Sequence, residues 1–282
     1  TIASFYNSLL TAISYLERIF ETIDEPVEVK DAPDATDMPP IKGDVSFKHV
    51  RFSYEDGVPI LKDVSFDVKQ GQTIAIVGPT GAGKTTIVNL LSRFYNVDSG
   101  EVLIDGIDIS KVKIHSLRTQ MGVMMQDSFI FSGTIMDNIR YGNKTATDEE
   151  VIRAAKTVCA HDFIMEMEEG YNTQVNERGS RLSVGQRQLI SFARALLANP
   201  AILILDEATS SIDTETEIVL QEGLNNLLKG RTSFIIAHRL STIKNADKIM
   251  YIDKGGILEA GSHDELLENK GAYYDLYMSQ YL

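Results

Sequence analysis

The chain has 282 residues, of which 43% are hydrophobic and 24% are charged, an ordinary composition for a folded globular protein without repeats. Its formal net charge of −13 disfavours nucleic acid as a partner, because binding to phosphates depends on lysine and arginine. The single cysteine, Cys159, excludes an internal disulfide, no Cys/His cluster has the spacing of zinc ligands, and no apolar run approaches the roughly 20 residues that span a bilayer. We therefore expect a reducing, cytoplasmic environment.

The first 40 residues differ from the rest of the chain. Apolar side chains recur three or four positions apart up to Ile23, which predicts an amphipathic helix that ends before Pro26. The segment that follows is rich in proline and aspartate, as linkers are. The helix either packs on its own domain or is the tail of a longer helix. We expect residues 1–40 to form this helix and an acidic linker, and residues 41–282 to form a separate domain.

Beyond Gly43 the pattern changes to that of an α/β protein. Two segments alternate polar and apolar residues like antiparallel strands, residues 44–54 and 64–68. Short continuous apolar runs predict strands buried on both faces of a sheet, at residues 73–77, 122–125, 201–205, 232–237 and 248–252. Helical stretches lie between the runs, and one of them begins with a capping box of Thr147 and Glu150. The sequence therefore predicts a layered sheet covered by helices.

The strongest local signal is GPTGAGKTT, residues 78–86, which follows a predicted buried strand and precedes a helix. It matches the pattern G-x-x-x-x-G-K-[ST] of a phosphate-binding loop, or P-loop. In such a loop the glycines let backbone N–H groups surround the phosphates, the lysine reaches the β- and γ-phosphates, and the hydroxyl binds Mg²⁺. The nucleotide-binding residues predicted here are Gly78, Pro79, Thr80, Gly81, Ala82, Gly83, Lys84, Thr85 and Thr86.

A second candidate site lies in ILILDEATSSID, residues 202–213. Four apolar residues deliver Asp206 and Glu207 to the end of a buried strand, where a purely structural interpretation has a turn. Two adjacent carboxylates at the mouth of a parallel sheet repel one another, and a cation relieves that repulsion. We expect Asp206 to hold Mg²⁺ through its water shell and Glu207 to act as general base on the attacking water.

The stretch RLSVGQRQL, residues 181–189, combines a helix start with an unexplained glycine. Ser183 and Gln186 form an S-x-x-Q capping box ahead of an apolar stripe. Gly185 weakens the first turn of this helix by roughly 1 kcal/mol relative to alanine. We therefore expect another group to come close to the backbone at this point.

Together these motifs resemble the nucleotide-binding domain of an ATP-binding cassette (ABC) transporter of the exporter type, from about Gly43 to the end of the chain. LSVGQ is similar to the signature L-S-G-G-Q of that family, and GPTGAGKTT, ILILDEATS and SSID are similar to its Walker A, Walker B and D-loop motifs. The resemblance also covers Tyr54, Gln126 and His238, which stand at the positions of the adenine-stacking aromatic, the Q-loop and the switch histidine.

The resemblance implies a P-loop NTPase core with a mixed sheet, an N-terminal antiparallel β subdomain and an inserted α-helical subdomain at about residues 127–198. It also implies that two such domains dimerise head to tail around two ATP molecules. Tyr54, the P-loop and Gln126 then bind nucleotide, and Glu207 and His238 are catalytic. The other implied site residues are the signature residues that face the partner's ATP (Ser183, Val184, Gly185, Gln186), the D-loop (Ser211, Asp213) and the Mg²⁺ ligands (Thr85, Gln126, Asp206).

Two further segments favour an exporter. TQVNERG, residues 173–179, resembles the exporter segment T-x-V-G-E-R-G, with Asn176 where the family usually has glycine. YLERIFETIDEP, residues 15–26, resembles the exit from the last transmembrane helix of such exporters. The resemblance thus implies a transmembrane domain as a partner within the same protein, coupling helices that contact residues 127–139, and a location at the cytoplasmic face of the cell membrane.

The signature departs from the family pattern at Val184, which replaces a glycine, while Glu207 is retained. Some exporters pair two unlike halves, one of which keeps the Walker B glutamate and has an altered signature. Leu189, where the family more commonly has arginine, indicates the same kind of half. The resemblance therefore favours a heterodimeric half-transporter over a homodimer.

Other classes of function share part of this pattern. A soluble ABC ATPase that is not attached to a membrane domain has the same motifs, but the acidic charge argues against those that act on DNA. A P-loop kinase or another NTPase leaves the signature, Gln126 and His238 unexplained. A non-hydrolysing interaction module with a decayed nucleotide site is disfavoured by Lys84, Asp206 and Glu207.

Overall fold

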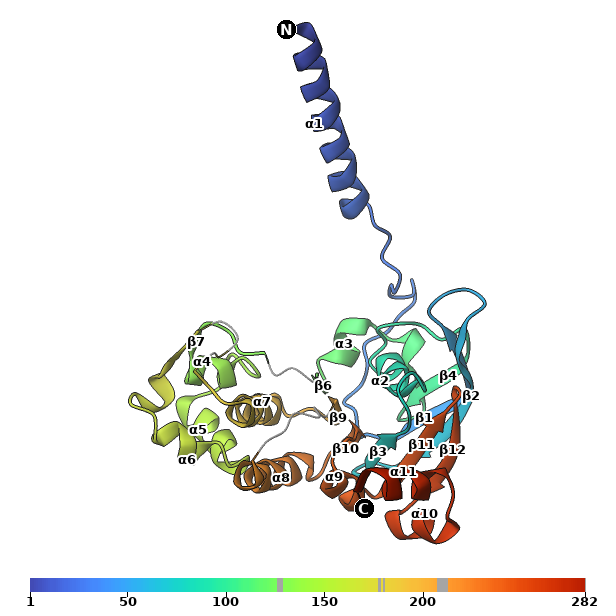
Figure 1. Ribbon diagram of the computed structural model, residues 1–282, viewed down its shortest axis with the longest axis vertical. Helices are drawn as coiled ribbons and strands as arrows, with labels where there is room; N and C mark the ends of the chain where they lie inside the picture. The colour runs from blue at the N-terminus through green and yellow to red at the C-terminus, as the bar shows by residue number, and fades with distance from the viewer. Residues whose placement is uncertain (126–128, 177–178, 180, 207–212, 282) are drawn as a thin grey trace. The chain divides into compact units, whose positions relative to one another are not determined.

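The computed structural model describes residues 1–281 except 126–128, 177–178, 180 and 207–212 (Figure 1). The chain divides into two units, Thr1–Lys30 and Asp31–Leu282. The boundary expected at residue 40 lies further along the chain than the one observed. The reason is that residues 31–40 pack on the second unit, so that only part of the acidic segment behaves as a linker.

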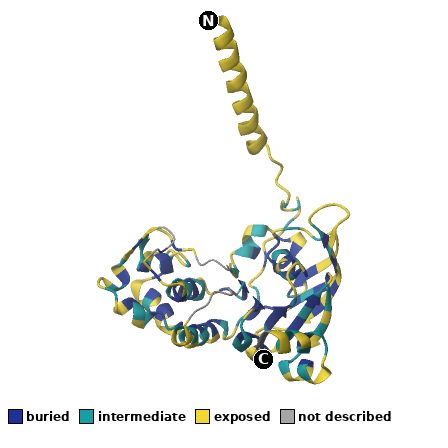
Figure 2. Ribbon diagram, in the orientation of Figure 1, coloured by how far each residue is buried: buried dark blue, intermediate teal, exposed yellow. Residues whose placement is uncertain are grey.

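The first unit consists of helix α1 (Ile2–Ile23) and a short tail. The helix ends before Pro26, as its periodicity predicts, and none of its residues is buried (Figure 2). No helix in the described ranges combines the length and the apolar character needed to cross a membrane. The large apolar side chains that α1 exposes are Ile2, Phe5, Tyr6, Leu9, Leu10, Ile13, Tyr15, Leu16, Ile19, Phe20 and Ile23.

An antiparallel sheet in the order β2-β1-β4-β5 lies near the start of the second unit. Its inner face carries Phe47 stacked on Phe66, with ring centroids 4.5 Å apart. The alternation predicted at residues 44–54 is confirmed, because β1 buries one side and exposes residues on the other. The strands are β1 (Val45–Ser53), β2 (Pro59–Val68), β4 (Ser99–Ile104) and β5 (Ile107–Asp108).

Six strands form the central sheet in the order β12-β11-β3-β10-β9-β6. Five of them run parallel, and β12 pairs antiparallel with β11 at one edge. The continuous apolar runs of the sequence are the parallel strands, so the predicted mixed sheet is confirmed. The strands are β3 (Thr73–Val77), β6 (Met121–Met124), β9 (Ile202–Asp206), β10 (Thr232–Ile236), β11 (Lys248–Asp253) and β12 (Gly256–Gly261).

Side chains of the central strands alternate between two hydrophobic clusters. On β3, Ile74 and Ile76 belong to the cluster shared with the antiparallel sheet, and Ala75 and Val77 belong to the cluster shared with the helices. Burial on both faces explains why these strands lack a polar alternation. Each fully buried aliphatic side chain stabilises the fold by roughly 1.5–3 kcal/mol. Polar groups of these strands can therefore reach solvent only at the strand ends.

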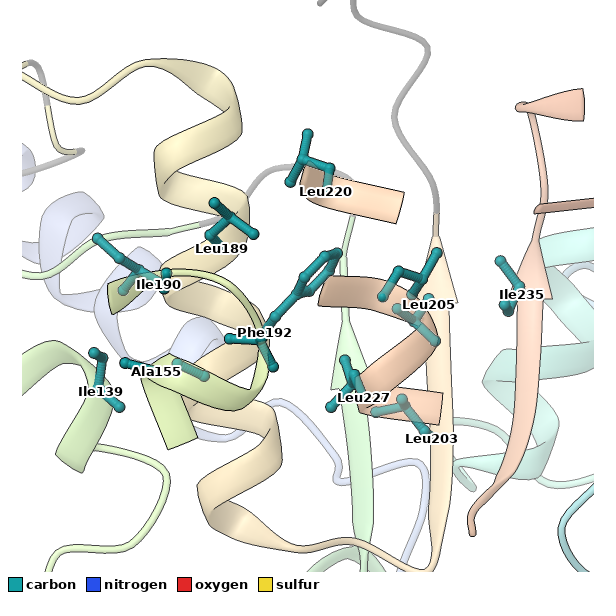
Figure 3. Close-up of a cluster of buried hydrophobic side chains, with 14 of the residues drawn as sticks. Ile139, Ala155, Leu189, Ile190, Phe192, Leu203, Leu205, Leu220, Leu227 and Ile235 are labelled. Carbon is teal, nitrogen blue, oxygen red and sulfur yellow. The ribbon is translucent and has the colours of Figure 1, made fainter. Parts of the chain in front are cut away.

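A group of helices lies beside β6 and β9 and corresponds to the α-helical subdomain that the resemblance implies (Figure 1). Figure 3 shows Phe192 of α7 pointing toward the sheet, near Leu205 of β9 and Leu227 of α8. The capping boxes predicted at Thr147 and Ser183 are both present. The elements of this group are β7 (Gly133–Thr134), α4 (Ile135–Arg140), α5 (Asp148–Thr157), α6 (His161–Met165), η2 (Gly170–Asn172), β8 (Gln174–Val175) and α7 (Val184–Ala198). Helix α8 (Thr214–Leu228) follows β9, outside the expected range, and packs against α7.

The remaining helices lie between strands of the two sheets or near the C-terminal end of the chain. Helix α2 follows the P-loop, and its residues Ile87 and Leu91 are buried between the two sheets. The bounds are α2 (Lys84–Leu91), η1 (Ile109–Lys111), α3 (Ile114–Arg118), α9 (Leu240–Asn245), α10 (His263–Asn269) and α11 (Ala272–Tyr281).

The second unit begins with a strap, residues 31–43, that packs against the segment preceding β6. The carboxylate of Asp31 accepts the backbone N–H of Ile114 at 2.8 Å. Thr36 and Val112 form a parallel bridge. These contacts explain why the strap is ordered although its composition is that of a linker: its polar groups find partners on the folded unit.

Gln120 binds the strap through its side-chain amide, beside further contacts from Asp105 and Ser116. Its Oε1 accepts the N–H of Ile41 at 2.8 Å, and its Nε2 donates to the carbonyl oxygens of Met38 and Pro39 at 3.3 and 3.1 Å. Its own carbonyl oxygen accepts the N–H of Ala201 at 3.0 Å. Gln120 directly precedes β6 and Ala201 directly precedes β9, so the strap is tied to the beginnings of two strands of the central sheet.

We expect Gln120→Ala to release the strap while the two sheets stay folded. Several partly buried backbone groups would lose their partner, which should lower the free energy of unfolding by about 1–3 kcal/mol. Limited proteolysis with mass spectrometry should find faster cleavage within residues 31–43. Gln70→Ala, at an exposed position, is the control. Equal cleavage rates in the two variants would show that Gln120 does not hold the strap.

Candidate functional site

The P-loop predicted at residues 78–86 connects β3 to α2. Gly78, Gly81 and Gly83 have φ angles of +141°, +79° and +105°, a region that residues with side chains rarely adopt. A Cβ atom on Gly78 would lie 2.1 Å from the carbonyl oxygen of Ile252, whereas one on Gly81 would meet no atom within 4 Å. The backbone at Gly81 is therefore open to an approaching group, which fits a phosphate cradle.

Lys84 is the first residue of α2, and its side chain turns back across the P-loop. Its Nζ donates to the carbonyl oxygens of Gly78 and Pro79, both at 2.8 Å. Partial burial lowers the pKa of Lys84, and the carboxylate of Asp206 opposes that shift. The ammonium group of Lys84 is thus held beside the P-loop backbone, where the negative charge of Asp206 at the end of β9 acts on it.

Three neighbouring strands bring predicted site residues to one edge of the central sheet, the edge formed by the carboxyl ends of its parallel strands. Ile76 of β3 pairs with Ile236 of β10, and Ile236 pairs with Asp206 of β9. Because these strands are parallel, the P-loop, the carboxylate of Asp206 and the segment with His238 all emerge at the same edge. His238 follows β10 and is exposed. The topology therefore gathers residues that are far apart in the sequence.

Asp206 has an electrostatically perturbed carboxyl group. Partial burial raises its pKa above the ordinary value, and the charges of His238 and Lys84 partly counteract that rise. Burial therefore makes ionisation of this group costly, and positive charge nearby makes it less so. A divalent cation at this edge would stabilise the ionised form further.

The donors at this edge fit Mg²⁺. Asp206 supplies a carboxylate, and Thr85 is exposed at the start of α2 with its hydroxyl. No group of three or more His, Cys, Asp or Glu side chains able to hold a metal ion occurs within the described part of the chain. Mg²⁺ commonly binds through one or two protein groups together with phosphate oxygens and water, so a sparse set of this kind suffices.

Three predicted site residues, Gln126, Glu207 and Ser211, lie outside the described residues. The second predicted D-loop residue, Asp213, is the N-cap of α8 and accepts the N–H of Thr216 at 2.9 Å. Hydrogen bonding from Thr216 lowers the pKa of the Asp213 carboxyl. Asp213 thus orients the start of α8, which packs beside the signature helix.

Tyr54 follows β1 and reaches α2 from the antiparallel sheet. Its hydroxyl oxygen lies 3.2 Å from Oγ1 of Thr86, and its side chain is 46% exposed. The sequence assigned both residues to the nucleotide site, and the structure brings them into direct contact. Tyr95 and Asn89 also contact Tyr54, and the sequence analysis missed both because neither belongs to a motif.

The signature residues form the start of α7. Ser183 Oγ accepts the N–H of Gln186 at 3.1 Å, and Gln186 Oε1 accepts the N–H of Ser183 at 3.0 Å. Val184 is the first residue of the helix and is 42% exposed. The amino end of this helix carries unpaired backbone N–H groups and the positive end of the helix dipole, which together attract anions.

Comparison with known proteins is consistent with this site. Residues 61–210, which include the P-loop, the signature and Asp206, match the family described as ABC transporter. The chain belongs to the ABC transporter family. The matched region is the ATPase domain of that family, with the mixed α/β architecture expected from the sequence.

The relatives of this ABC ATPase domain are longer proteins. The chain is 54% identical over 280 residues to an uncharacterized ABC transporter ATP-binding protein of Bacillus subtilis (strain 168), YknV, covering 99% of this chain and 46% of that protein. It is 48% identical over 275 residues to the fatty acid ABC transporter ATP-binding/permease protein of Mycobacterium tuberculosis (strain CDC 1551 / Oshkosh), covering 98% and 43%. The chain thus spans a little less than half the length of the relatives it matches.

A solved structure is similar in fold as well as in sequence. The structure of a bacterial Atm1-family ABC exporter with ATP bound matches with a TM-score of 0.88 and 42% identity. The match covers 98% of this chain and 48% of the exporter chain. The P-loop NTPase fold expected from the motifs is therefore the fold of an ABC ATPase domain.

Gly185 of the ABC signature has a structural reason that the sequence did not reveal. A Cβ atom on Gly185 would lie 2.4 Å from Cγ2 of Thr216 on α8 and 3.5 Å from Cδ1 of Leu220. The group that comes close to this backbone within the chain is therefore α8. The missed residue, Thr216, is 31 positions away in the sequence, and no local pattern connects it to the signature.

We expect Gly185→Ala to lower the free energy of unfolding by about 1–3 kcal/mol, the usual scale for an overpacked contact. Thr216→Ser removes the methyl group that would clash and keeps the hydroxyl, so the double variant should regain most of this loss. Urea unfolding measures both effects. Gly256→Ala is the matched control, because a Cβ there would meet nothing within 4 Å. A double variant no more stable than Gly185→Ala would refute this role of Thr216.

Proposed function

We propose that this chain is the ATP-binding and ATP-hydrolysing domain of an exporter-type ABC half-transporter, which powers export by ATP-driven dimerisation with a second ATPase domain. This proposal rests on one observation above all. The P-loop, Asp206 and His238 lie at the same edge of the central sheet. The charges of Lys84 and His238 both counteract the rise in the pKa of Asp206, which supports the proposal because it indicates that these groups lie around one shared region.

The nucleotide would bind along this edge between Tyr54 and the P-loop. Tyr54 offers a partly exposed aromatic ring to the purine, and the open backbone at Gly81 offers N–H groups to the phosphates. Lys84 would exchange its two carbonyl partners for oxygens of the β- and γ-phosphates. These contacts assign the purine and the triphosphate to two different parts of the fold.

The residues proposed to hold Mg²⁺ are Thr85, Gln126 and, through water, Asp206. When bound, Mg²⁺ neutralises charge on the β- and γ-phosphates. Glu207 would accept a proton from the water that attacks the γ-phosphorus, and His238 would contact the γ-phosphate. Asp206 and Glu207 would thus have different roles although they are adjacent: Asp206, the last residue of β9, would hold the cation, and Glu207 would act on the water.

The proposed dimer places the start of α7 against the ATP held by the partner domain. Ser183 and Gly185 would present the helix N-terminus to the γ-phosphate. Val184, exposed at the first helical position, is the residue that departs from the family's signature, and it favours a partner that is an unlike half. Leu189, the other departure from the family pattern, is 4% exposed and packs in the cluster shared with the helices.

The proposed membrane partner would contact an aromatic docking surface formed by Phe129, Phe131 and Tyr141. The three rings lie in a row, with centroid distances of 5.0 and 4.6 Å, and each is exposed by more than a third. A cavity of about 320 Å³ next to them is lined by Met125, Phe129 and Arg194 among others. An exposed apolar surface of this kind is typical of a protein contact site.

Arg194 joins this docking surface to the signature helix. It lies on α7 and donates to the carbonyl oxygens of Asn138 and Phe129 at 2.9 and 3.0 Å. Its guanidinium carbon is 5.4 Å from the centroid of the Phe131 ring. Because one helix carries both Ser183 and Arg194, a movement of the docking surface would be passed to the signature.

Helix α1 supports attachment to a transmembrane domain. It exposes an apolar face that nothing in its own unit buries, and we propose that it continues from the last membrane helix of the transporter. Relatives named ATP-binding/permease proteins are longer chains, and their names join ATP binding with a permease. The domain would then lie at the cytoplasmic face of the membrane.

We expect Glu207→Gln to bind ATP with nearly the parent affinity and to hydrolyse it at least about 10²-fold more slowly, because the side chain keeps its size and loses its basicity. Steady-state phosphate release and equilibrium ATP binding measure the two effects. Lys84→Ala should instead weaken ATP binding itself. Near-normal turnover in Glu207→Gln would reject Glu207 as the base, and unchanged ATP affinity in Lys84→Ala would argue against the P-loop role.

Dimerisation of this chain should require nucleotide, since ATP stabilises only the closed form. Light scattering should find a monomer without nucleotide, and a dimer of Glu207→Gln in the presence of ATP and Mg²⁺. The double variant with Lys84→Ala is the control and should stay monomeric. A tight dimer in the absence of nucleotide would contradict the proposed mechanism.

A further inference from the structure

We propose that Thr86 and Tyr95 are positioning residues that hold the ring of Tyr54 at a fixed place beside the P-loop helix, so that the purine end and the phosphate end of the site are set together. This inference rests on the proposed function, in which Tyr54 stacks on the purine. It concerns how Tyr54 is placed, which no motif of the sequence specifies.

The hydroxyl of Tyr54 is held from α2. It lies 3.2 Å from Oγ1 of Thr86, and Nδ2 of Asn89 lies 3.5 Å from the same oxygen. Thr86 is only 4% exposed and sits in the first turn of α2, two residues after Lys84. A buried hydroxyl of this kind needs a partner, and Tyr54 supplies one.

The ring of Tyr54 is held by two other aromatic rings. Phe52 contacts it at a centroid distance of 4.8 Å and an interplanar angle of 88°, and Tyr95 at 5.0 Å and 85°. Perpendicular contacts of this type are favourable because the edge of one ring meets the face of another. Phe52 is 3% exposed and therefore provides a rigid base. The Tyr54 side chain nevertheless remains 46% exposed, so it can still contact a ligand.

The arrangement matters because the two ends of the site belong to different sheets. Tyr54 follows β1 of the antiparallel sheet, and Thr86 belongs to the helix that follows β3 of the central sheet. A nucleotide that contacts both ends loses less entropy when their separation is already set. The hydrogen bond between Tyr54 and Thr86 spans this junction directly, 32 positions apart in the sequence.

The hydroxyl contact is tested by a double-mutant cycle on equilibrium binding of ATP. Tyr54→Phe and Thr86→Val each remove one partner and should each weaken ATP binding about fivefold, the scale of one hydrogen bond. The double variant should bind no more weakly than either single variant, because the same interaction is lost. Thr86→Ser keeps the hydroxyl and should restore the parent affinity.

The ring contact is tested at Tyr95. Tyr95→Leu should weaken ATP binding severalfold, and Tyr95→Phe, which retains the ring, should bind like the parent. Inorganic tripolyphosphate is the second probe, because it lacks the purine. Its affinity should be the same in the parent and in the two Tyr95 variants. Thermal unfolding of each variant verifies that the fold is intact.

The outcomes separate this proposal from the proposed function. If Tyr54→Ala binds ATP as tightly as the parent, Tyr54 has no purine role. The part of the proposed function that assigns the purine to Tyr54 then fails, and so does the positioning role of Thr86 and Tyr95. If Tyr54→Ala is impaired but the losses in Tyr54→Phe and Thr86→Val simply add, only the positioning role is overturned. A loss of tripolyphosphate affinity in Tyr95→Leu would show that Tyr95 acts on the phosphate end of the site and would also overturn it.

Discussion

Burial of the central sheet on both faces is the constraint on which the rest of the structure depends. Alternate residues of β3, β9 and β10 enter two separate hydrophobic clusters, so none of these strands has a side that could carry polar chemistry. Charged groups are confined to the strand ends, since an ionised side chain inside either cluster would lose its hydration without compensation. The placement of Lys84 and Asp206 at one edge follows from this two-sided burial, as does the rise in the pKa of Asp206.

Close backbone packing in the helical part ties the signature to the core. Gly185 lets α7 approach Thr216, and Gly223, in the interior of α8, is similarly close to its neighbours: a Cβ there would lie 2.5 Å from the carbonyl oxygen of Val158. Helix propensity alone would favour alanine at both positions by roughly 1 kcal/mol. The glycines are retained because packing outweighs propensity. The signature helix and α8 therefore form one tightly packed pair.

Two segments outside the site, the strap and the docking surface, are each bound to the central sheet or to a helix beside it. The strap is bound through Gln120 to the start of β6 and, through the next hydrogen bond, to Ala201 before β9. The docking surface is bound through Arg194 to α7. Both connections consist of side chains that bond to backbone groups, which restrain the partner segment in position and direction. The strap is thereby fixed to the beginnings of β6 and β9, and the docking surface is fixed to the signature helix.

Elements and motifs that depend on neighbours a few residues away could be predicted from the sequence. The buried strands, the capping box of Ser183 and the P-loop are of this kind, because periodicity, caps and glycine conformations are local properties. Contacts between distant residues, in contrast, became known only from the folded chain. Thr216 at Gly185 and Tyr95 at Tyr54 lie in different elements, and their contact results from how helices and sheets pack, which no spacing along the chain encodes. The strap is a further case, since a linker composition becomes ordered only where folded partners for its backbone exist.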